Sequence, residues 1–467
     1  MTSYVVLSGC ANGGMRMKKM LCLLLLLLPL TAFAEGELYP ARGDNGLYGY
    51  INAQAEWVIA PQFDGAGGFR GEYAAAWMIP DDVDRNEWSG YDWLDYDCMG
   101  VIDRTGNWVL PPAYSLTSGQ SGDWFGGKDE GIWLVNQWES SDLMGFFDIP
   151  SGTFSGLKWH EVWHWCSDSR LIPVVESESY LAGYADRSTG EVVIPYQYYS
   201  VNPANFNDGI ATVALSDEDG MEISPWHLIN EQGETIPLPE GYQSDYANDF
   251  SCGRIAVVSP EGLWGFADRE GRIVIPAQFG YAYQFCEGFA EVTFPEGDSG
   301  YIAVDGNVLA RGFANTFSFR NGYAEVWLSG TNGADKVTAW INSRGEIVPF
   351  MDSDRFYPIS EDRIWMRTGK EYSAPYHLLD GEGNVLTGEP YNLMEMESWS
   401  FDEGLQAVRN ADGKWGYIDL NGEVVIPFIY NAAYAFEGEL AKVRLGDRVG
   451  YIDKAGNAVY MWDDPVE

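Results

Sequence analysis

The sharpest chemical motif in the sequence is the segment 160–164, His-Glu-Val-Trp-His, which matches the pattern H-E-x-x-H. In a helix this spacing places two imidazoles one turn apart as zinc ligands and leaves the glutamate to activate water. The stretch from Trp159 to Cys166 holds three tryptophans and has no good N-cap before it, so it is a poor helix former. The third ligand would have to come from residues that form no recognisable signature: Glu176, Glu178 or Glu191. A zinc-dependent peptidase using His160, Glu161 and His164 is therefore the alternative interpretation, and a solvent-facing connector is the favoured one.

Other chemistry-bearing residues are sparse. The sequence contains no G-x-S-x-G elbow and no G-x-x-x-x-G-K-[ST] loop, so it offers no motif for a serine hydrolase or a nucleotide site. His227 and His377 each occupy a position where related segments carry glycine, which makes them variants of a repeat rather than ligands. We predict no catalytic residues, no metal site and no cofactor.

Acidic residues gather in three short clusters without the twelve-residue spacing of a calcium loop, so solvated acid is favoured over calcium binding. The clusters are Asp81, Asp82 and Asp84; Asp92, Asp95 and Asp97; and Asp217, Glu218 and Asp219.

One insertion combines aromatic and acidic side chains. Residues 81–165 hold nine of the 19 tryptophans. Aromatic rings beside carboxylates can stack on sugar rings and accept their hydroxyls, or anchor a protein partner. The candidate partner-binding residues are therefore Trp88, Tyr91, Asp92, Trp93 and Asp95, with packing of the insertion onto its own repeat as the competing interpretation.

The charge balance excludes several classes of partner. With 28 Lys and Arg against 69 Asp and Glu, the 467-residue chain has a formal charge of −41, while its apolar fraction of 46% is that of a globular protein. Such an acidic surface repels phosphate backbones and anionic lipid heads, which excludes non-specific binding to nucleic acid or to a membrane surface.

The N-terminus has the form of a secretory signal peptide. Arg16, Lys18 and Lys19 precede an apolar run from Met20 to Leu30, and residues 32–34 (Ala-Phe-Ala) form a cleavage pattern. We expect a signal peptide over residues 1–34, with the true start at Met15 or Met17, and export to the periplasm, the cell surface or the extracellular space. Cleavage removes three cations and no acid, which takes the charge from −41 to −44. No later segment reaches the length of a membrane-spanning helix, so we expect no span in the mature chain.

An internal repeat organises the rest of the sequence, residues 35–467. Segments 264–276 and 415–427 are two copies of one unit. The glycine-like position of this unit recurs eleven times with spacings of 34 to 51 residues, at Gly49, Gly100, Gly145, Gly183, His227, Gly265, Gly300, Ala339, His377, Gly416 and Gly450.

Each copy predicts a β-hairpin followed by a third strand. Ten of the eleven copies place Asp or Asn at the start of the turn, and ten close it with Gly, as Asp419 and Gly422 do. The second strand often reaches a proline such as Pro427, which we expect to end the ladder. Because three short strands cannot bury an aromatic face alone, neighbouring copies must stack.

The motif Lys414-Trp415-Gly416-Tyr417-Ile418-Asp419 resembles those of the bacterial WG repeat proteins, and the resemblance covers nearly all of the mature chain. It implies an exported tandem array of short β-strands with no established enzymatic activity and a role in interaction. We therefore predict an all-β array of about eleven hairpin or three-stranded repeats, with insertions in repeats one to three (about residues 80–165). An open solenoid is favoured, and a β-propeller-like closure is the alternative.

Four cysteines remain after cleavage, and Cys252 and Cys286 lie near equivalent positions of neighbouring repeats. They are the candidate disulfide, against free thiols as the favoured state. The function that these patterns support best is a non-catalytic binding or scaffold module for a protein or glycan partner. A zinc peptidase and a purely structural surface spacer are the alternatives.

Overall fold

The computed structural model describes residues 36–80, 98–117, 131–137, 141–163, 169–199, 205–217, 222, 224–244, 249–328, 337–351, 355–393 and 399–464. All of these residues belong to one compact unit, Gly36–Glu467. Every regular element in them is a β-strand, so the prediction of an all-β fold is confirmed. Within the same ranges no helix is long and apolar enough to cross a membrane.

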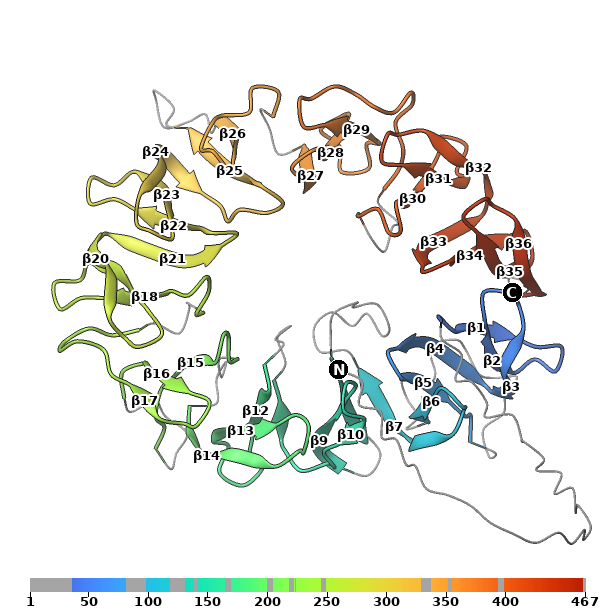
Figure 1. The fold of residues 1–467 in the computed structure, drawn as a ribbon, viewed down its shortest axis with the longest axis horizontal. Coiled ribbons are helices and arrows are strands. Elements are labelled where there is room, and N and C mark those ends of the chain that lie inside the picture. The colour runs from blue at the N-terminus through green and yellow to red at the C-terminus, as the bar shows by residue number, and fades with distance from the viewer. Residues whose placement is uncertain are drawn as a thin grey trace, which may run out of the picture. The chain divides into compact units, whose positions relative to one another are not determined.

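The strands fall into eleven successive groups, one for each repeat of the sequence (Figure 1). Repeats one to six contain β1 (Tyr39–Arg42), β2 (Tyr48–Ile51) and β3 (Trp57–Phe63); β4 (Gly65–Arg70), β5 (Tyr73–Trp77), β6 (Met99–Asp103) and β7 (Trp108–Thr117); β8 (Ile132–Gln137), β9 (Ser141–Asp148) and β10 (Thr153–Phe154); β11 (Glu161–Val162), β12 (Leu171–Val175), β13 (Ala182–Asp186) and β14 (Val192–Tyr198); β15 (Ile210–Val213), β16 (His227–Asn230) and β17 (Thr235–Ile236); β18 (Ile255–Val258), β19 (Trp264–Ala267) and β20 (Ile273–Phe279). Repeats seven to eleven contain β21 (Tyr281–Cys286), β22 (Phe289–Thr293), β23 (Ser299–Ala303) and β24 (Val308–Thr316); β25 (Tyr323–Leu328) and β26 (Val337–Asn342); β27 (Phe356–Ser360), β28 (Arg363–Arg367) and β29 (Tyr376–Asp380); β30 (Leu405–Arg409), β31 (Trp415–Asp419) and β32 (Val424–Tyr430); β33 (Ala432–Glu437), β34 (Leu440–Leu445), β35 (Arg448–Asp453) and β36 (Ala458–Asp463).

Sequential strands pair in order, and the described strands form nine sheets. Two of these sheets combine two repeats each, because β7 and β24 are long enough to pair with the strand before them and, further along, with the strand after them. Nine sheets therefore contain eleven repeats, and the glycine-like position of every repeat lies on the strand that precedes its hairpin turn.

The turn between these two strands is built as its sequence predicts. In repeat ten, Asp419 Oδ1 accepts the backbone N–H of Asn421 and that of Glu423, both at 2.9 Å. Gly422 closes the turn with φ of 78°, a conformation that costs a residue with a Cβ about 1 kcal/mol. The same pattern recurs in the other repeats, so the predicted Asp/Asn-to-Gly turn is confirmed.

The Trp-Gly pair has a geometric cause. Trp415 pairs with Tyr430 and Tyr417 with Ile426, so β32 carries two extra residues opposite Gly416. A Cβ on Gly416 would lie 2.7 Å from the Ile426 carbonyl oxygen, which is too close for any side chain. Pro427 lies in this bulge, where no ladder N–H is needed. The expectation that proline ends the strand is therefore wrong, since β32 continues to Tyr430, and β3, β14 and β20 continue in the same way.

A buried tyrosine joins each of several repeats to the next. The Tyr417 hydroxyl in repeat ten donates to the carbonyl oxygen of Tyr434 in repeat eleven at 2.9 Å. Tyr434 sits in a bulge of β33, between the pairs Ala433–Val443 and Phe436–Ala441, where its carbonyl is released from the ladder. Tyr50 and Tyr301 make the equivalent bonds to Gly67 and Phe317. Burial raises the pKa of Tyr417, so the hydroxyl remains a neutral donor.

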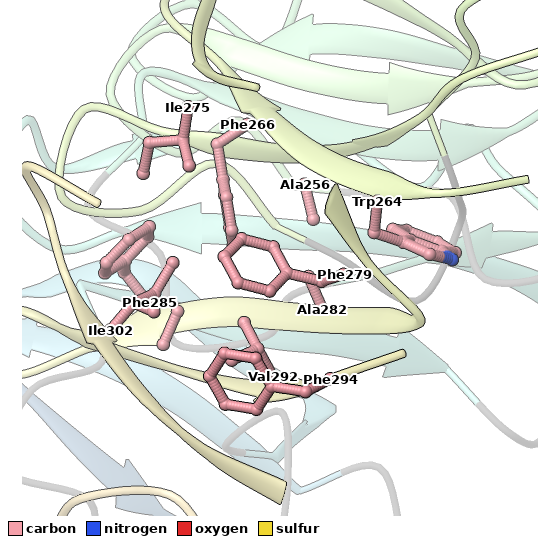
Figure 2. Close-up of a cluster of buried hydrophobic side chains, with 11 residues drawn as sticks. Ala256, Trp264, Phe266, Ile275, Phe279, Ala282, Phe285, Val292, Phe294 and Ile302 are labelled. Carbon is pink, nitrogen blue, oxygen red and sulfur yellow. The ribbon is translucent and has the colours of Figure 1, made fainter. Parts of the chain in front are cut away.

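The hydrophobic core lies between neighbouring repeats rather than inside any one of them. Figure 2 shows Phe266, Ile275 and Phe279 of repeat six packed with Phe285 and Ile302 of repeat seven. Similar clusters join other consecutive repeats, and this is the stacking that three-stranded units require.

The first and last repeats also pack together. Tyr39, Ala41 and Ile51 share a buried cluster with Tyr451 and Trp462 (Figure 1 shows β1 beside β35 and β36). The hydroxyls of Tyr451 and Tyr460 donate to the carbonyl oxygens of Pro40 and Arg42, at 2.9 and 3.1 Å. The tandem array is as predicted, but of the two arrangements the β-propeller-like closure fits these contacts, and the preference for an open solenoid is corrected. The reason is that the turn from each repeat to the next brings the eleventh repeat back against the first.

The candidate disulfide is not formed, since Cys252 and Cys286 are both free. The Cys286 thiol donates to the Phe319 carbonyl oxygen at 3.1 Å and so engages repeat eight instead of repeat six. Cys252 is exposed at a turn, Cys98 is buried, and Cys166 lies outside the described residues.

Candidate functional site

A cleft of about 630 Å³ opens between repeats eight and nine. Its lining includes the hairpin turn after β26, with Ser343, Arg344 and Glu346, and the turns of repeat nine, with Glu361 and Glu382. Ile347 and Phe350 supply an apolar wall. The volume falls in the range of ligand sites, about 300–1,000 Å³.

The sequence of repeat eight explains why the cleft is open. Pro349 follows Gly345 by four residues, whereas Pro276 of repeat six follows Gly271 by five. The segment after this turn forms no named strand and pairs with β26 at the bridge from Ile341 to Ile347. Two backbone bonds support this pairing, from the Asn342 N–H to the Glu346 carbonyl oxygen and from the Val348 N–H to the Trp340 carbonyl oxygen. Ile347 is 51% exposed, close to the 49% of Val424, the equivalent residue of repeat ten.

The cleft has an excess of negative charge. Its lining holds three carboxylates, from Glu346, Glu361 and Glu382, against the single guanidinium of Arg344, a net charge of −2. Arg344 Nε already donates to Glu346 Oε2 at 2.8 Å, and Asn342 Nδ2 donates to the same oxygen at 3.1 Å. The hydrogen bonds from Asn342 and Arg344 lower the pKa of Glu346, so this carboxylate stays ionised well into mildly acidic solution.

Glu361 extends from repeat nine toward repeat eight. Its Oε1 accepts the Ser343 hydroxyl at 3.3 Å. A Cβ built on Gly322 of repeat eight would lie 2.5 Å from Glu361 Cγ, so the side chain lies directly against the turn before β25. The glycine at position 322 is what allows this approach.

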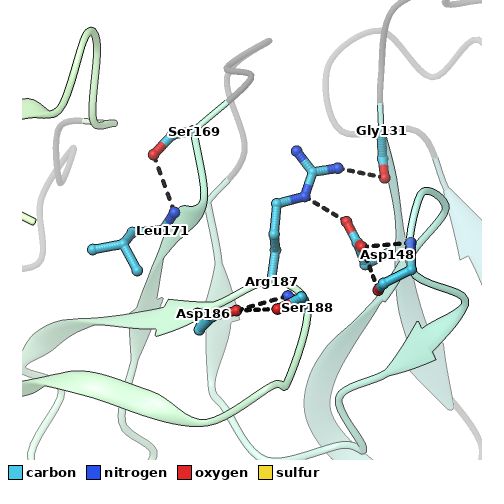
Figure 3. A network of polar contacts seen from close by, with 8 residues as sticks. Gly131, Asp148, Ser169, Leu171, Asp186, Arg187 and Ser188 are labelled. Atoms are coloured by element: carbon cyan, nitrogen blue, oxygen red, sulfur yellow. Dashed lines mark hydrogen bonds and ion pairs between the residues drawn. The ribbon is translucent and has the colours of Figure 1, made fainter. Parts of the chain in front are cut away.

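Four other boundaries between repeats are occupied differently. In four repeats the residue after the turn-start Asp is a cation: Arg104, Arg187, Arg269 and Lys454. Each of them reaches the segment just before the first strand of the preceding repeat. Arg187 is the most buried: its Nη2 donates to the Gly131 carbonyl oxygen at 2.6 Å, and its Nε donates to Asp148 (Figure 3). Arg269 donates to the Asp208 carbonyl oxygen, and Lys454 Nζ lies 3.1 Å from Glu403 Oε2.

Repeat nine has Gly381 at this position, so it sends no cation into the boundary that forms the cleft. A Cβ on Gly381 would lie 2.8 Å from the Glu361 carbonyl oxygen, which leaves no room for a side chain. The cleft thus lies at a boundary where a carboxylate, Glu361, stands in the region that Arg or Lys enters elsewhere.

The H-E-x-x-H segment is partly described. Glu161 and Val162 form β11, which pairs with β12, so this part of the segment is extended where a zinc-binding motif needs a helix. The His160 ring packs edge-on against Tyr180 at 4.7 Å, and Trp163 Nε1 donates to Glu161 Oε2 at 2.8 Å. His164 lies outside the described residues. Among those described, no three His, Cys, Asp or Glu side chains are grouped so as to hold a metal ion.

Trp159, just before this segment, occupies the place in its repeat that Phe279 has in repeat six. It forms a bridge with Met144, as Phe279 does with Trp264 in repeat six, and its ring stacks on Phe146 at 5.6 Å. His227 begins β16 and His377 lies in β29, the strands that precede the hairpin turns of their repeats. The Nδ1 atom of His227 contacts the Pro225 carbonyl oxygen, and that of His377 contacts Thr387 Oγ1.

The predicted partner-binding residues Trp88, Tyr91, Asp92, Trp93 and Asp95 lie outside the described residues, as do the acidic clusters at 81–84 and 92–97 and Glu218 and Asp219. The cleft was not predicted. The sequence contains two signals for the cleft: the shortened spacing from Gly345 to Pro349 and the glycine at position 381. They can be interpreted only when the contacts of the arginines in other repeats are known.

Several solved structures show weak similarity: a eukaryotic initiation factor (8% identity, 77% of this chain and 97% of that chain, TM-score 0.37), BamB from Moraxella catarrhalis (12%, 75% and 95%, TM-score 0.27) and apo AztD from Citrobacter koseri (11%, 78% and 91%, TM-score 0.25). These values support no statement about function. No curated protein matches the chain. A family model described as WG containing repeat matches residues 48–76, 99–118, 183–217, 264–294 and 415–448. These five segments of the chain therefore match the WG containing repeat.

Proposed function

We propose that the mature chain is an exported, non-catalytic binding or scaffold protein whose partner is a protein or a glycan. The observation that carries the proposal is the cleft between repeats eight and nine, where an exposed apolar wall meets uncompensated carboxylates. Apolar surface beside a few placed polar groups is the usual composition of a binding site.

The direct test is capture from a cell-envelope extract by the immobilised mature chain, with proteins and glycans detected separately. We expect one defined species, retained less by Ile347→Ser, because this substitution removes the most exposed apolar side chain of the cleft. Val308→Ser is the matched control, since Val308 of repeat seven is 50% exposed and Ile347 is 51% exposed. Equal capture by both variants would move the binding site elsewhere on the chain, and no specific capture by the wild type would favour the structural spacer.

The zinc peptidase alternative has its own measurement. Metal analysis of the purified chain and a peptide-cleavage assay should give no zinc and no cleavage. One bound zinc that is lost in His164→Ala would overturn the non-catalytic proposal.

Export is tested at the N-terminus. N-terminal sequencing of the protein recovered from the envelope or the medium should begin at Glu35. A chain retained in the cytoplasm with its first residues intact would contradict the proposed signal peptide.

A further inference from the structure

We infer that the cleft between repeats eight and nine binds a basic side chain, Arg or Lys, of a partner polypeptide. This inference rests on the proposed binding function and names the chemistry of the partner. It follows from what the chain itself places at the equivalent positions of other repeats.

Four of the boundaries between repeats accept a cation from the next repeat, and the corresponding turn position is uncharged or acidic in the other seven repeats. At Gly36, Gly131 and Asp208 a backbone carbonyl oxygen receives a guanidinium from the next repeat, and at Glu403 a carboxylate receives an ammonium group. Carbonyl and carboxylate oxygens offer no donors, so the natural occupant of such a place is a cation. The four internal contacts therefore show the chemical group that such a place binds, a guanidinium or an ammonium group.

At the boundary between repeats eight and nine the internal cation is absent, because Gly381 replaces it and has no room for a side chain. Glu361 and Glu382 contribute carboxylates there, and Arg344 compensates only Glu346, to which it is bonded. The cleft consequently keeps its negative charge, whereas the four boundaries described above each receive a cation from the next repeat. A basic side chain of a partner could supply the cation that this boundary lacks.

The shape of the cleft suits a long basic side chain better than a bare ion. Ile347 and Phe350 can cover the aliphatic stem, and the carboxylates can receive the charged head. The formal charge of −41 on the whole chain would attract a basic polypeptide and repel an acidic one. A neutral glycan has no group for these carboxylates to neutralise, so the charge favours the polypeptide.

The test measures binding of a labelled, end-capped tetra-arginine peptide to the mature chain by fluorescence anisotropy, with a tetra-citrulline peptide as the uncharged isostere. We expect the arginine peptide to bind at least about tenfold more tightly, and rising ionic strength to weaken it. The double variant Glu361→Gln, Glu382→Gln should weaken its binding by about tenfold or more, since it removes both uncompensated carboxylates.

The matched control removes the same charge elsewhere. Glu56 and Glu234 hold the position of Glu346 in the turns of repeats one and five, each bonded to its turn-start Asn at 2.9 Å. The double variant Glu56→Gln, Glu234→Gln should change binding by less than about twofold, the scale of a surface charge effect. Ser343→Arg provides a gain-of-charge variant: it places a guanidinium beside Glu361 and should block the peptide as strongly as the double cleft variant.

Equal binding of the arginine peptide to the cleft variant and to the control variant would overturn the inference. It would also be overturned if an oligomer of glucosamine bound through Glu361 and Glu382 and the peptide did not, because the ligand would then be a cationic glycan. The proposed function fails separately: it is lost if the envelope extract yields no partner, whatever the peptide does. The proposed binding function remains supported if the Glu361→Gln, Glu382→Gln variant still captures a partner.

Discussion

The Tyr39 hydroxyl donates to the carbonyl oxygen of Glu437 at 2.8 Å, across 398 residues of sequence, and accepts the backbone N–H of Glu439 at 3.1 Å. One side chain of the first repeat thus satisfies two backbone groups of the last. The Tyr39 ring also lies 5.3 Å from that of Tyr451. No strand of the first repeat pairs with a described strand of the last, so the closure depends on side chains such as this one.

Replacing Tyr39 with Phe should weaken this closure. The ring packing survives, but the two backbone groups lose their partner, which typically costs about 1–3 kcal/mol when the groups are buried. We expect a lower midpoint in thermal or urea unfolding of the mature chain. Tyr283→Phe is the control, because Tyr283 is 49% exposed, and it should stay within about 0.5 kcal/mol of wild type. If the two variants unfold alike, the bond to Glu437 contributes nothing to the closure.

The sequence predicts those parts of the fold that are local. The Asp419-to-Gly422 turn and the stacking of aromatic residues between repeats follow from residues a few positions apart, and both are confirmed. The contact between the first and last repeats cannot be predicted in this way, because nothing in the sequence near Tyr39 or Glu437 indicates that they meet. The position of Pro427 in a bulge could not be predicted from the sequence either. A missing N–H fits both a strand end and a bulge, and only the pairing of Tyr430 with Trp415 decides between them.

The site was harder to predict than the fold. Its chemistry is defined by a departure from the repeat pattern, a glycine at position 381 where Arg187 or Lys454 stands in other copies. Such a departure can be interpreted only when the partners of those cations are known. The H-E-x-x-H segment gave the stronger sequence signal, yet its described part pairs as a strand.

The Trp-Gly pair makes a steric prediction. Gly416→Ala places a Cβ 2.7 Å from the Ile426 carbonyl oxygen and 2.9 Å from Phe428 Cδ1, so β31 and β32 must separate. We expect a loss of about 2 kcal/mol, as for other overpacked positions, measured by urea unfolding. Gly388→Ala is the control, since a Cβ there meets nothing within 4 Å, and it should be within about 0.5 kcal/mol of wild type. A neutral Gly416→Ala would show that the bulge in β32 yields at little cost.

The buried pair of Arg187 and Asp148 should dominate the stability of the boundary between repeats three and four. Their side chains are only 12% and 2% exposed. Arg187→Met leaves the carboxylate buried without its cation, which usually costs about 3–5 kcal/mol. Arg448→Met breaks the exposed pair with Asp463 (56% and 90% exposed) and should cost less than about 1 kcal/mol. Similar unfolding midpoints for the two variants would mean that the buried pair adds no more than a surface pair.

The turn-start aspartates should make stability depend on pH. Hydrogen bonds from the side chain and backbone of Asn384 hold the pKa of Asp380 below its ordinary value. A carboxyl whose pKa is lower in the folded state stabilises the fold fully above its unfolded value, about 3.9, and loses that contribution as the pH falls through the folded value. Asp380→Asn keeps the oxygen that accepts the N–H of Glu382 and cannot titrate, as in repeats that already use Asn52, Asn230 or Asn342.

We therefore expect Asp380→Asn to match wild type in thermal midpoint at pH 7 and to lose less of it between pH 5 and pH 3, a window set by the ordinary aspartate value of about 3.9. Asp380→Ala removes the acceptor altogether and should lower the midpoint at both ends of this range. The comparison separates charge from hydrogen bonding at a single turn. Parallel pH profiles for wild type and Asp380→Asn would contradict it, because protonation of the Asp380 carboxyl would then cost the fold nothing.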